Sequence, residues 1–268
     1  MRNKLFNIFR KHKRILVLGG GGARGFVSVG VLKSLEKHFG KDIPFDMVIG
    51  TSMGSLIGAS FCLGKDAATL EKMALEVNWP RLIDLGFNLT GLVKGERMEE
   101  IIRSTIDDKL FSEMKIPFAL TTTDIETGEE LVHTEGDLGK LIRASCSWPG
   151  IVSAVNIDGR LLVDGGVRNS IPTKAAKAFD ATFILAVDPG FGVDNQKPKN
   201  AFKALVQSLQ IMGEELNNYQ CLAADVVIKP TLKDIHQFDF EKVAIIIRQG
   251  EKAADAKIAE LKKKLFWN

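Results

Sequence analysis

A serine framed by glycines is the first candidate for chemistry. Residues 50–54 have the sequence Gly-Thr-Ser-Met-Gly, which places Ser52 in a GxSxG pattern. The mostly apolar run 45–49 before it predicts a buried strand, and the small and apolar residues after it predict a helix. A serine on such a strand-to-helix turn projects from a sharp bend, for which Gly50 and Gly54 leave room. Ser52 is therefore the predicted nucleophile.

A glycine-rich loop offers a place for developing negative charge. Residues 19–25 have the sequence Gly-Gly-Gly-Gly-Ala-Arg-Gly and follow the mostly apolar run 14–18, which predicts another strand. Unhindered backbone N–H groups beside a helix N-terminus bind anions. In a serine hydrolase the anion is the oxyanion of the tetrahedral intermediate, so this loop is a candidate oxyanion hole.

The same loop also contains a GxGxxG pattern, the fingerprint of dinucleotide-binding folds. That function needs an acidic residue at the carboxyl end of the next strand, where the acid binds a ribose. Asp42 and Asp46 lie at the amino end of that strand, which is the wrong end. A phosphate-binding loop of the GxxxxGK type is excluded as well, because no lysine follows Gly25.

Two arrangements can supply a base for Ser52. Asp164, in the Asp-Gly-Gly sequence 164–166, can act directly in a Ser-Asp dyad, or it can orient His236 in a Ser-Asp-His triad. The four histidines occur in contexts more typical of surface or structural residues. His12 lies in a basic tail and His38 at the polar end of a helix. His133 follows a hairpin strand, and His236 has no glycine or strand nearby in the sequence.

The elements that must position these groups alternate between strands and helices. The predicted strands are 14–18, 45–49, 118–123, 129–133, a hairpin at 155–163, 182–187 and 225–229, and the predicted helices are 25–39, 54–63, 138–145, 201–222 and 241–265. This alternation is typical of an α/β fold with a mostly parallel sheet and helices on both faces. In such folds ligands bind beyond the carboxyl ends of the strands.

Two segments do not fit this simple alternation. Residues 65–112 are mostly helical and amphipathic, with breaks at Trp79-Pro80 and Thr90-Gly91 and no evident strand, so we expect an insertion or lid beside the sheet. Residues 47–64 are uncharged and about long enough to span a membrane. Their glycines and serines predict a break within the segment instead.

Composition excludes several classes of function. The 268 residues are 45% hydrophobic and 26% charged, which is typical of a globular protein. The formal net charge is +3, but residues 1–14 hold six basic residues and no acid, so the remainder is acidic on balance and no nucleic-acid-binding surface is expected. Three cysteines without CxxC spacing indicate neither a disulfide framework nor a zinc site, and they fit a reducing cytoplasm.

Both ends of the chain combine basic and apolar residues. Residues 1–14 have the amphipathic pattern of an interfacial helix, and residues 262–267 have the sequence Lys-Lys-Lys-Leu-Phe-Trp. We expect these segments either to contact an anionic membrane surface or to be solvated.

The motifs together resemble a known family. GGGGARG, GTSMG and DGG occur in that order, with Arg-Ala-Ser-Cys-Ser-Trp-Pro-Gly at 143–150 and Ile-Asp-Gly at 157–159 just ahead of Asp164. This combination resembles the bacterial patatin-like phospholipases over about residues 14–254. The resemblance implies a three-layer α/β/α fold, a Ser-Asp dyad without histidine, and hydrolysis of lipid acyl esters.

The resemblance also implies roles for single residues. It makes Ser52 the nucleophile, Asp164 its general base, and backbone N–H groups near Gly20, Gly21 and Gly22 the oxyanion hole. The motif positions expected to support these groups are Arg24, Gly25, Gly50, Gly54, Gly165 and Gly166. The guanidinium of Arg24 is expected either to pin the loop through carbonyl groups or to face a lipid phosphate.

The whole pattern predicts a basic extension at 1–14 and one hydrolase domain at 15–268. The expected substrate is a phospholipid, a lysophospholipid or another acyl ester at a membrane surface, and no metal or cofactor is expected. Three other functions stay open: an acyl-ligand-binding protein with little turnover, an esterase that uses His236, and a nucleotide-dependent oxidoreductase.

Overall fold

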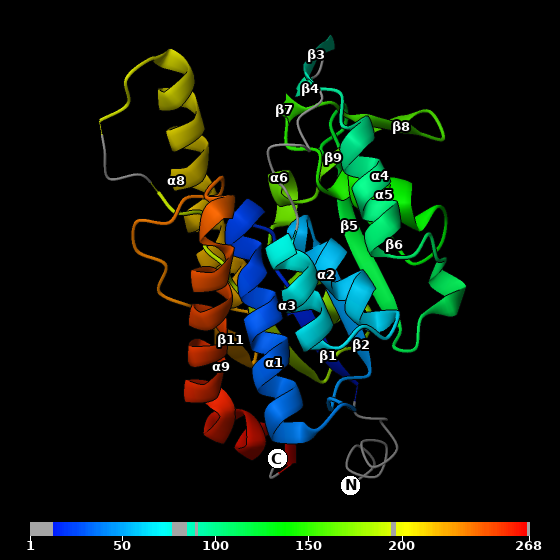
Figure 1. Cartoon of the computed structure of the whole chain (residues 1–268), viewed down its shortest axis with the longest axis vertical. Helices are drawn as coiled ribbons and strands as arrows, with labels where there is room; N and C mark the ends of the chain where they lie inside the picture. The colour runs from blue at the N-terminus through cyan, green and yellow to red at the C-terminus, as the bar shows by residue number, and fades with distance from the viewer. Residues whose placement is uncertain (1–12, 77–84, 89–90, 194–196, 267–268) are drawn as a thin grey trace, which may run out of the picture.

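The fold is a three-layer α/β/α arrangement, seen in a computed structural model that describes residues 13–76, 85–88, 91–193 and 197–266 (Figure 1). Within these residues, the central sheet has eight strands in the order β11-β10-β1-β2-β5-β9-β8, with β6 paired to β5. The strands are β1 (Arg14–Leu18), β2 (Met47–Thr51), β5 (Phe118–Asp124), β6 (Glu130–His133), β8 (Val155–Ile157), β9 (Arg160–Asp164), β10 (Phe183–Val187) and β11 (Val226–Ile228).

The sheet is parallel from β11 to β5 and antiparallel beyond it. Strands β11, β10, β1, β2 and β5 pair in parallel. Strands β6 and β9 pair with β5 in the opposite direction, and β8 forms a hairpin with β9. The sequence prediction of a mostly parallel sheet is therefore confirmed, with an antiparallel extension on one side.

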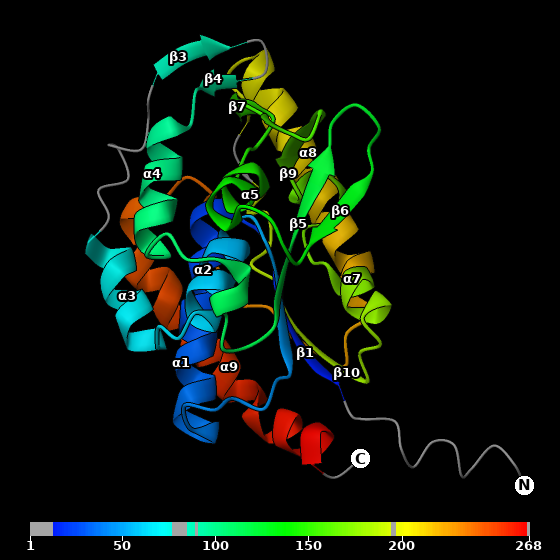
Figure 2. The same cartoon turned by 90° about the vertical axis from the view of Figure 1, so that its right-hand side faces the viewer.

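Consecutive residues of β1 enter two separate hydrophobic cores. Leu16 and Leu18 pack into the core under helices α1 (Val27–Phe39), α2 (Met53–Cys62) and α9 (Val243–Phe266). Ile15 and Val17 point the other way, toward α7 (Thr173–Ala178). Helix α8 (Ala201–Cys221) lies on the same side as α7, and Figure 2 shows the two helical layers on either side of the strands. Because the apolar side chains of β1 point alternately to the two faces of the sheet, they pack against both helical layers.

The segment predicted to be a helical insertion contains strands, so the expectation of no strand there is wrong. Helices α3 (Ala67–Glu76) and α4 (Glu96–Thr105) flank β3 (Leu85–Asn88) and β4 (Gly91–Val93). β4 pairs in parallel with β7 (Gly150–Val152), which lies far away in the sequence. A strand this short is stabilised by its distant partner and leaves no local periodicity to detect. The predicted break at Trp79-Pro80 lies outside the described residues.

The other predicted elements are close to their predicted positions, whereas the short helices α6 (Gly166–Asn169) and α7 were not predicted. The first helix starts with the short 3₁₀ turn η2 (Gly22–Phe26) before α1, and α5 spans Leu138–Ser145 as predicted. Residues 47–64 divide into β2 and α2, which confirms the predicted break. No helix in the described residues is long and apolar enough to cross a bilayer. Residues 1–12, the main part of the predicted basic extension, lie outside the described residues.

Helices α1 and α9 lie side by side in both views and cross with their backbones in contact (Figures 1 and 2). A Cβ atom at Gly30 would lie 2.0 Å from the carbonyl oxygen of Ile247. A Cβ atom at Gly250 would lie 2.3 Å from the carbonyl oxygen of Val27. Since both neighbours are backbone atoms, neither helix can accommodate a side chain at the crossing without moving away.

We therefore expect Gly250→Ala to lower the free energy of unfolding by about 2 kcal/mol or more, despite the higher helix propensity of alanine. The measurement is urea unfolding followed by circular dichroism. Lys252→Ala, at an exposed position of the same helix, is the matched control and should change the value by less than about 0.5 kcal/mol. Equal stability of the two variants would contradict the close crossing.

Candidate active site

Strand register brings Asp164 next to Ser52. Thr51, at the end of β2, pairs with Thr121 of β5, and the following residue Thr122 pairs with Asp164 at the end of β9. The Oγ of Ser52 donates a hydrogen bond of 2.6 Å to Oδ2 of Asp164. The two side chains singled out in the sequence therefore meet, although β9 approaches antiparallel to β5.

The backbone of Ser52 adopts the strained conformation of a sharp turn, with φ 52° and ψ −127°. Its N–H donates to Oγ of Ser145 at 2.8 Å, and that hydroxyl donates in turn to the carbonyl of Thr121 at 2.8 Å. Ser145 thus links the turn to β5. The sequence analysis assigned no role to Ser145. Its place in the motif at 143–150 is the feature that could have identified it.

The glycines around the turn are required by close backbone contacts. A Cβ atom at Gly54 would lie 2.2 Å from the carbonyl oxygen of Leu18, and one at Gly50 would lie 2.4 Å from the carbonyl oxygen of Gly54. A Cβ atom at Gly20 would lie 3.0 Å from Cβ of Ser52. The glycine-rich loop and the serine turn therefore touch each other directly.

Two further supporting glycines, Gly25 and Gly165, also fill tight positions. A Cβ atom at Gly25 would lie 2.6 Å from Cβ of Met53, which follows Ser52. A Cβ atom at Gly165 would lie 2.6 Å from the carbonyl oxygen of Thr121. These contacts hold the glycine loop and the Asp-Gly-Gly turn against the first turn of α2 and β5.

Asp164 is buried and well connected. Its Oδ1 accepts the N–H of Gly166 at 2.7 Å, while Oδ2 accepts the hydroxyl of Ser52. Burial raises the pKa of Asp164 to about 6, and the hydrogen bonds from Ser52 and Gly166 oppose part of that rise. The carboxylate is therefore a stronger base than an exposed aspartate and is still mostly ionised at neutral pH.

Two backbone N–H groups of the glycine loop can bind an oxyanion, whereas the sequence predicted three. The N–H of Gly20 already donates to the carbonyl of Ser170 at 3.0 Å, so it is not available to an oxyanion. The N–H groups of Gly21 and Gly22 have no acceptor within the described residues. Gly22 adopts φ +55°, and a Cβ atom there would lie 2.3 Å from the carbonyl oxygen of Gln237. Both its backbone conformation and the lack of space therefore favour glycine at position 22.

Arg24 pins three loops together. Its Nε donates to the carbonyls of Pro189 and Gly190 at 2.9 Å each, and its Nη1 donates to those of Leu232 and Ile235 at 3.1 and 2.6 Å. Only 6% of the residue is exposed. Of the two expectations for this arginine, the structure agrees with the pinning of the loop, since the guanidinium faces carbonyls.

No histidine in the described part of the chain hydrogen-bonds to Ser52 or Asp164. Nδ1 of His236 lies 3.4 Å from the carbonyl of Gly192, and Nε2 of His133 lies 2.8 Å from Oγ1 of Thr122. Burial lowers the pKa of His133 to about 4, so its ring is neutral at physiological pH. The geometry thus favours a carboxylate partner for the serine.

Asp46 lies where the sequence placed it, at the amino end of the sheet. Its Oδ2 accepts the N–H of Arg14, the first residue of β1, at 2.7 Å. An acid in this place is at the opposite end of the strands from the glycine loop. The requirement of a dinucleotide site for an acidic residue near the loop is therefore not met by Asp46.

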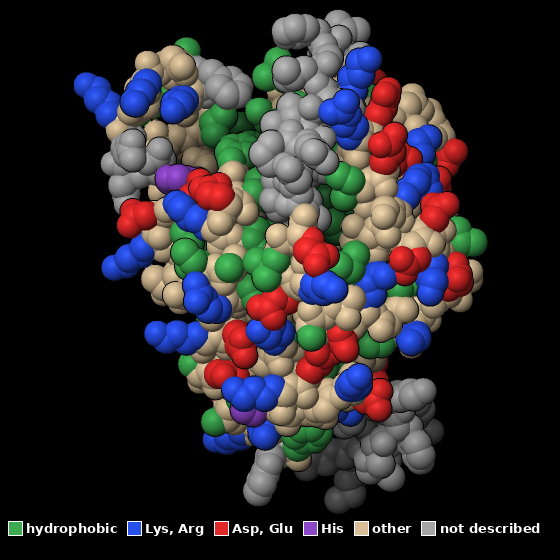
Figure 3. All heavy atoms as spheres, in the orientation of Figure 1, with side chains coloured by type: hydrophobic (Ala, Val, Ile, Leu, Met, Phe, Trp, Pro, Cys, Tyr) green, Lys and Arg blue, Asp and Glu red, His purple; other side chains and the backbone are tan. Residues whose placement is uncertain are grey.

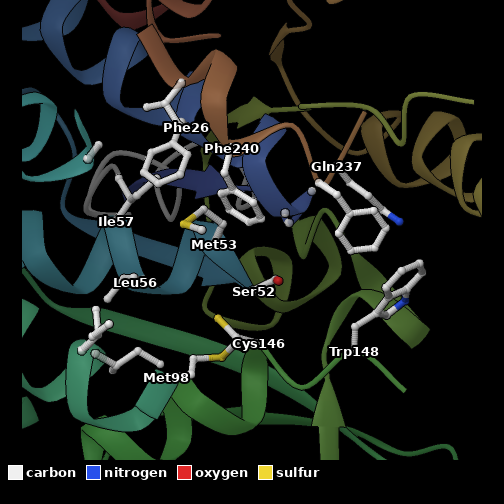
Figure 4. Close-up of a pocket in the computed structure, with 18 of the residues that line it drawn as sticks. Phe26, Ser52, Met53, Leu56, Ile57, Met98, Cys146, Trp148, Gln237 and Phe240 are labelled. Carbon is white, nitrogen blue, oxygen red and sulfur yellow. The ribbon is translucent and has the colours of Figure 1, made fainter. Parts of the chain in front are cut away.

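Ser52 opens into an apolar cavity of about 800 Å³. Figure 4 shows its hydroxyl near the centre, with Leu56 and Met98 on one side and Trp148 and Gln237 on the other. Most of the lining comes from aliphatic, methionine and aromatic side chains of η2, α2, α3, α4 and the start of α9. A cavity of this kind suits an acyl chain or another apolar group.

Cys146 lies beside Ser52 in the lining of the cavity. Burial, reinforced by the nearby charge of Asp164, raises the pKa of its thiol to about 12. The thiol is therefore protonated at neutral pH and is a poor nucleophile. Of the two candidate nucleophiles in this wall, only Ser52 is paired with a base.

Comparison with known proteins gives the family. The model of the patatin-like phospholipase family matches residues 16–177. The neuropathy target esterase sws of Drosophila melanogaster is 36% identical over 183 residues, which cover 65% of this chain and 13% of the relative. Patatin-like phospholipase domain-containing protein 6 of Homo sapiens is 33% identical over 198 residues, which cover 70% and 14%. The chain thus spans 13–14% of the length of these relatives.

Solved structures share the fold. VipD from Legionella pneumophila superposes with a TM-score of 0.67 at 12% identity, covering 93% of this chain and 67% of that chain. The type III effector protein ExoU superposes with a TM-score of 0.51 at 12% identity, covering 93% and 53%. At such identity the likeness concerns the fold alone. The curated relatives named above are animal proteins, so they give no support to the bacterial branch suggested by the sequence. The chain belongs to the patatin-like phospholipase family.

Proposed function

We propose that the protein is a serine lipid acyl hydrolase that uses Ser52 and Asp164 as a catalytic dyad. The observation that carries the proposal is the 2.6 Å hydrogen bond between the two side chains at the wall of an apolar cavity. Membership of a family of patatin-like phospholipases supports lipid esters as the substrate class. The relatives contain much more chain than this one, so their whole activities are not transferred to it.

The first half of the reaction forms an acyl-enzyme. Oγ of Ser52 attacks the carbonyl carbon of the ester while its proton passes to Oδ2 of Asp164. The carbonyl oxygen becomes an oxyanion, which the N–H groups of Gly21 and Gly22 stabilise. When the bond to the leaving alcohol breaks, Asp164 returns the proton to the alkoxide, and the acyl group remains on Ser52.

The second half releases the acid. Water attacks the acyl carbon, and Asp164 accepts a proton from it. The new tetrahedral intermediate collapses, the carboxylic acid leaves, and the proton held by Asp164 returns to Oγ of Ser52. Each cycle therefore consumes one ester and one water and restores both side chains.

An aspartate can serve as this base because of its surroundings. An exposed aspartate, with a pKa near 3.9, is a weak base for a hydroxyl. Burial brings the pKa of Asp164 to about 6, which is closer to the working pH. Exclusion of water also strengthens the interaction of the oxyanion with N–H groups.

The position of the basic end of α9 determines how a membrane bound there would lie relative to Ser52. Lys262 lies over the ring of Phe39 at 5.6 Å, and Lys264 donates to the carbonyl of Asp225 at 2.5 Å. Figure 1 shows this end of α9 at the amino ends of the strands, whereas Ser52 follows the carboxyl end of β2. A membrane bound by this end of α9 would thus tether the protein and would not deliver lipid directly to Ser52. Residues 1–12 and 267–268 lie outside the described residues.

We also propose that residues 15–268 form one hydrolase domain and act in the cytoplasm. The larger of the two hydrophobic cores joins β1, α2 and α9, whose residues come from both ends of this range. The cysteines of the described residues, Cys62, Cys146 and Cys221, are all free thiols, as expected in a reducing compartment.

Ser52→Ala is expected to abolish hydrolysis of p-nitrophenyl esters and labelling by a fluorophosphonate probe, with a loss of several orders of magnitude in kcat. Ser60→Ala is the matched control, because Ser60 is a buried serine of α2, the helix that follows Ser52, and it also lines the cavity. The control should keep both activity and labelling. Labelling of folded Ser52→Ala at wild-type level would contradict the assignment, and failure of wild type to react would favour an acyl-ligand-binding protein.

A second comparison separates the dyad from a triad. Asp164→Asn preserves the shape of the side chain but removes the proton acceptor, so kcat should fall by at least about 1,000-fold. His236→Ala and His133→Ala should each retain most of the activity, since neither ring contacts the serine. Circular dichroism first checks that all three variants fold. A folded but inactive His236→Ala beside a partly active Asp164→Asn would replace the dyad with a Ser-Asp-His esterase mechanism.

The pH dependence follows from the ionisation of Asp164. Only the carboxylate accepts a proton, so kcat/KM should rise with pH through an apparent pKa of about 6 and then level off. Ionisation of a carboxyl group has a small enthalpy, whereas that of an imidazole is large. The apparent pKa should therefore barely change between two temperatures. A pKa that falls clearly on warming would indicate histidine as the base.

A further inference from the structure

In helix α8, polar residues face the domain and large apolar residues face the solvent, the reverse of the usual arrangement. A helix on the surface of a globular protein normally packs its apolar face on the core and exposes its polar face. In α8 the buried positions include Gln210 and Asn217, whereas large apolar residues are exposed. Figure 1 shows α8 at the margin of the molecule, with its N-terminal part projecting beyond the neighbouring elements.

Hydrogen bonds attach the inner face of α8 to the domain. Asn217 Nδ2 donates to Oδ1 of Asp188 at 2.9 Å, and Glu214 Oε2 accepts the N–H of Phe191 at 2.9 Å. Oε1 of Gln220 accepts the N–H of Ile171 at 2.8 Å. The helix is thus held by directed polar contacts, which leave its apolar residues free for another surface.

The exposed apolar residues form one continuous stripe with alternating spacings of four and three. The members of this stripe, called the seam, are Leu205, Leu209, Met212, Leu216 and Tyr219, exposed by 59%, 43%, 66%, 39% and 64%. This spacing is that of the a and d positions of a heptad, which pack against a second helix. Figure 3 shows hydrophobic side chains in the hollow beside α8, whereas charges of both signs are mixed over the lower part of that face.

The charges of α8 fit a helical partner better than a bilayer. Interfacial helices carry several Lys or Arg residues beside their apolar face. Between residues 201 and 221, Lys203 is the sole basic residue, and Glu215 is the sole acid outside the inner face, because Glu214 pairs with Lys229 there. The helix therefore lacks the row of basic residues by which an interfacial helix binds an anionic membrane.

We propose that the seam docks against the seam of a second copy of this chain, with the two α8 helices antiparallel. At about 200 Å² for a fully exposed large side chain, the seam offers roughly 500 Å² per copy, or about 1,000 Å² for the pair, which is the size at which specific interfaces begin. A two-fold axis requires a self-complementary patch.

The seam is self-complementary when two copies run in opposite directions. With the two-fold axis midway between Leu209 and Met212, Leu209 of one copy lies opposite Met212 of the other, and Leu205 lies opposite Leu216. Each a position then faces a d position. Such pairing buries the seam along most of a helix about 31 Å long.

The test is analytical ultracentrifugation of the full chain over a wide range of protein concentration. Wild type should show a monomer–dimer equilibrium, and Leu209→Glu should raise the dimer Kd by at least about 100-fold. Ile211→Glu is the matched control: Ile211 is 53% exposed but lies off the seam, about 100° around the helix from Met212, so its Kd should stay close to wild type. Circular dichroism and ester hydrolysis verify that each variant is folded.

A mixing experiment tests the antiparallel register. Leu209→Glu and Met212→Lys should each be monomeric alone, and their mixture should form a heterodimer, because the carboxylate introduced in one copy then faces the ammonium group introduced in the other. No recovery on mixing would overturn the antiparallel arrangement. A monomeric wild type would overturn the proposal, and so would binding of the seam to phosphatidylcholine/phosphatidylglycerol vesicles that Leu209→Glu abolishes. These outcomes do not depend on the catalytic assignment.

Discussion

The backbone conformation of Ser52 is the constraint on which the rest of the site depends. A φ of 52° is uncommon for a residue with a side chain and costs about 1–3 kcal/mol. It turns the hydroxyl toward Asp164 and brings the turn so close to its neighbours that Gly50 and Gly54 have no room for a Cβ atom. Hydrogen bonds to Ser145 and Asp164 offset the strain. The GxSxG spacing is thus the sequence pattern that one strained residue requires.

How far the sequence predicts this molecule depends on the distance between interacting segments. The turn at Ser52 and the glycine loop are predictable because strand, turn and helix are contiguous there. The pairing of β4 with β7 is not, since segments 91–93 and 150–152 stabilise each other without local periodicity. The hydrogen bonds from Gly20 to Ser170 and from Ser52 to Ser145 also join segments far apart in the sequence. The motifs therefore predict that Gly20 and Ser145 lie near the site, but they do not predict these hydrogen bonds.

Buried arginines build the frame around the apolar cavity. Loops that leave the ends of strands carry carbonyl groups without strand partners, and each needs a donor. A guanidinium has five N–H donors and can satisfy several carbonyls at once. Arg24 does so for loops on both sides of the glycine loop, and Arg143 does so for Lys94, Gly95 and Ser153 near β4 and β7. The walls are thereby fixed by donors outside the cavity, which leaves its volume free for an apolar ligand.

The same loop chemistry accounts for the reversed polarity of α8. The segment after β10 presents the N–H group of Phe191 and the carboxylate of Asp188 toward the helix. An apolar inner face would leave the N–H group of Phe191 unpaired, at about 1–3 kcal/mol, and would remove one of the donors to Asp188. Glu214 and Asn217 are therefore required on the inner face by a loop that must also hold Arg24 and the glycine loop. Because the inner face is committed to polar contacts, the residues of the seam stay exposed among the described residues and are available to a second copy of the chain.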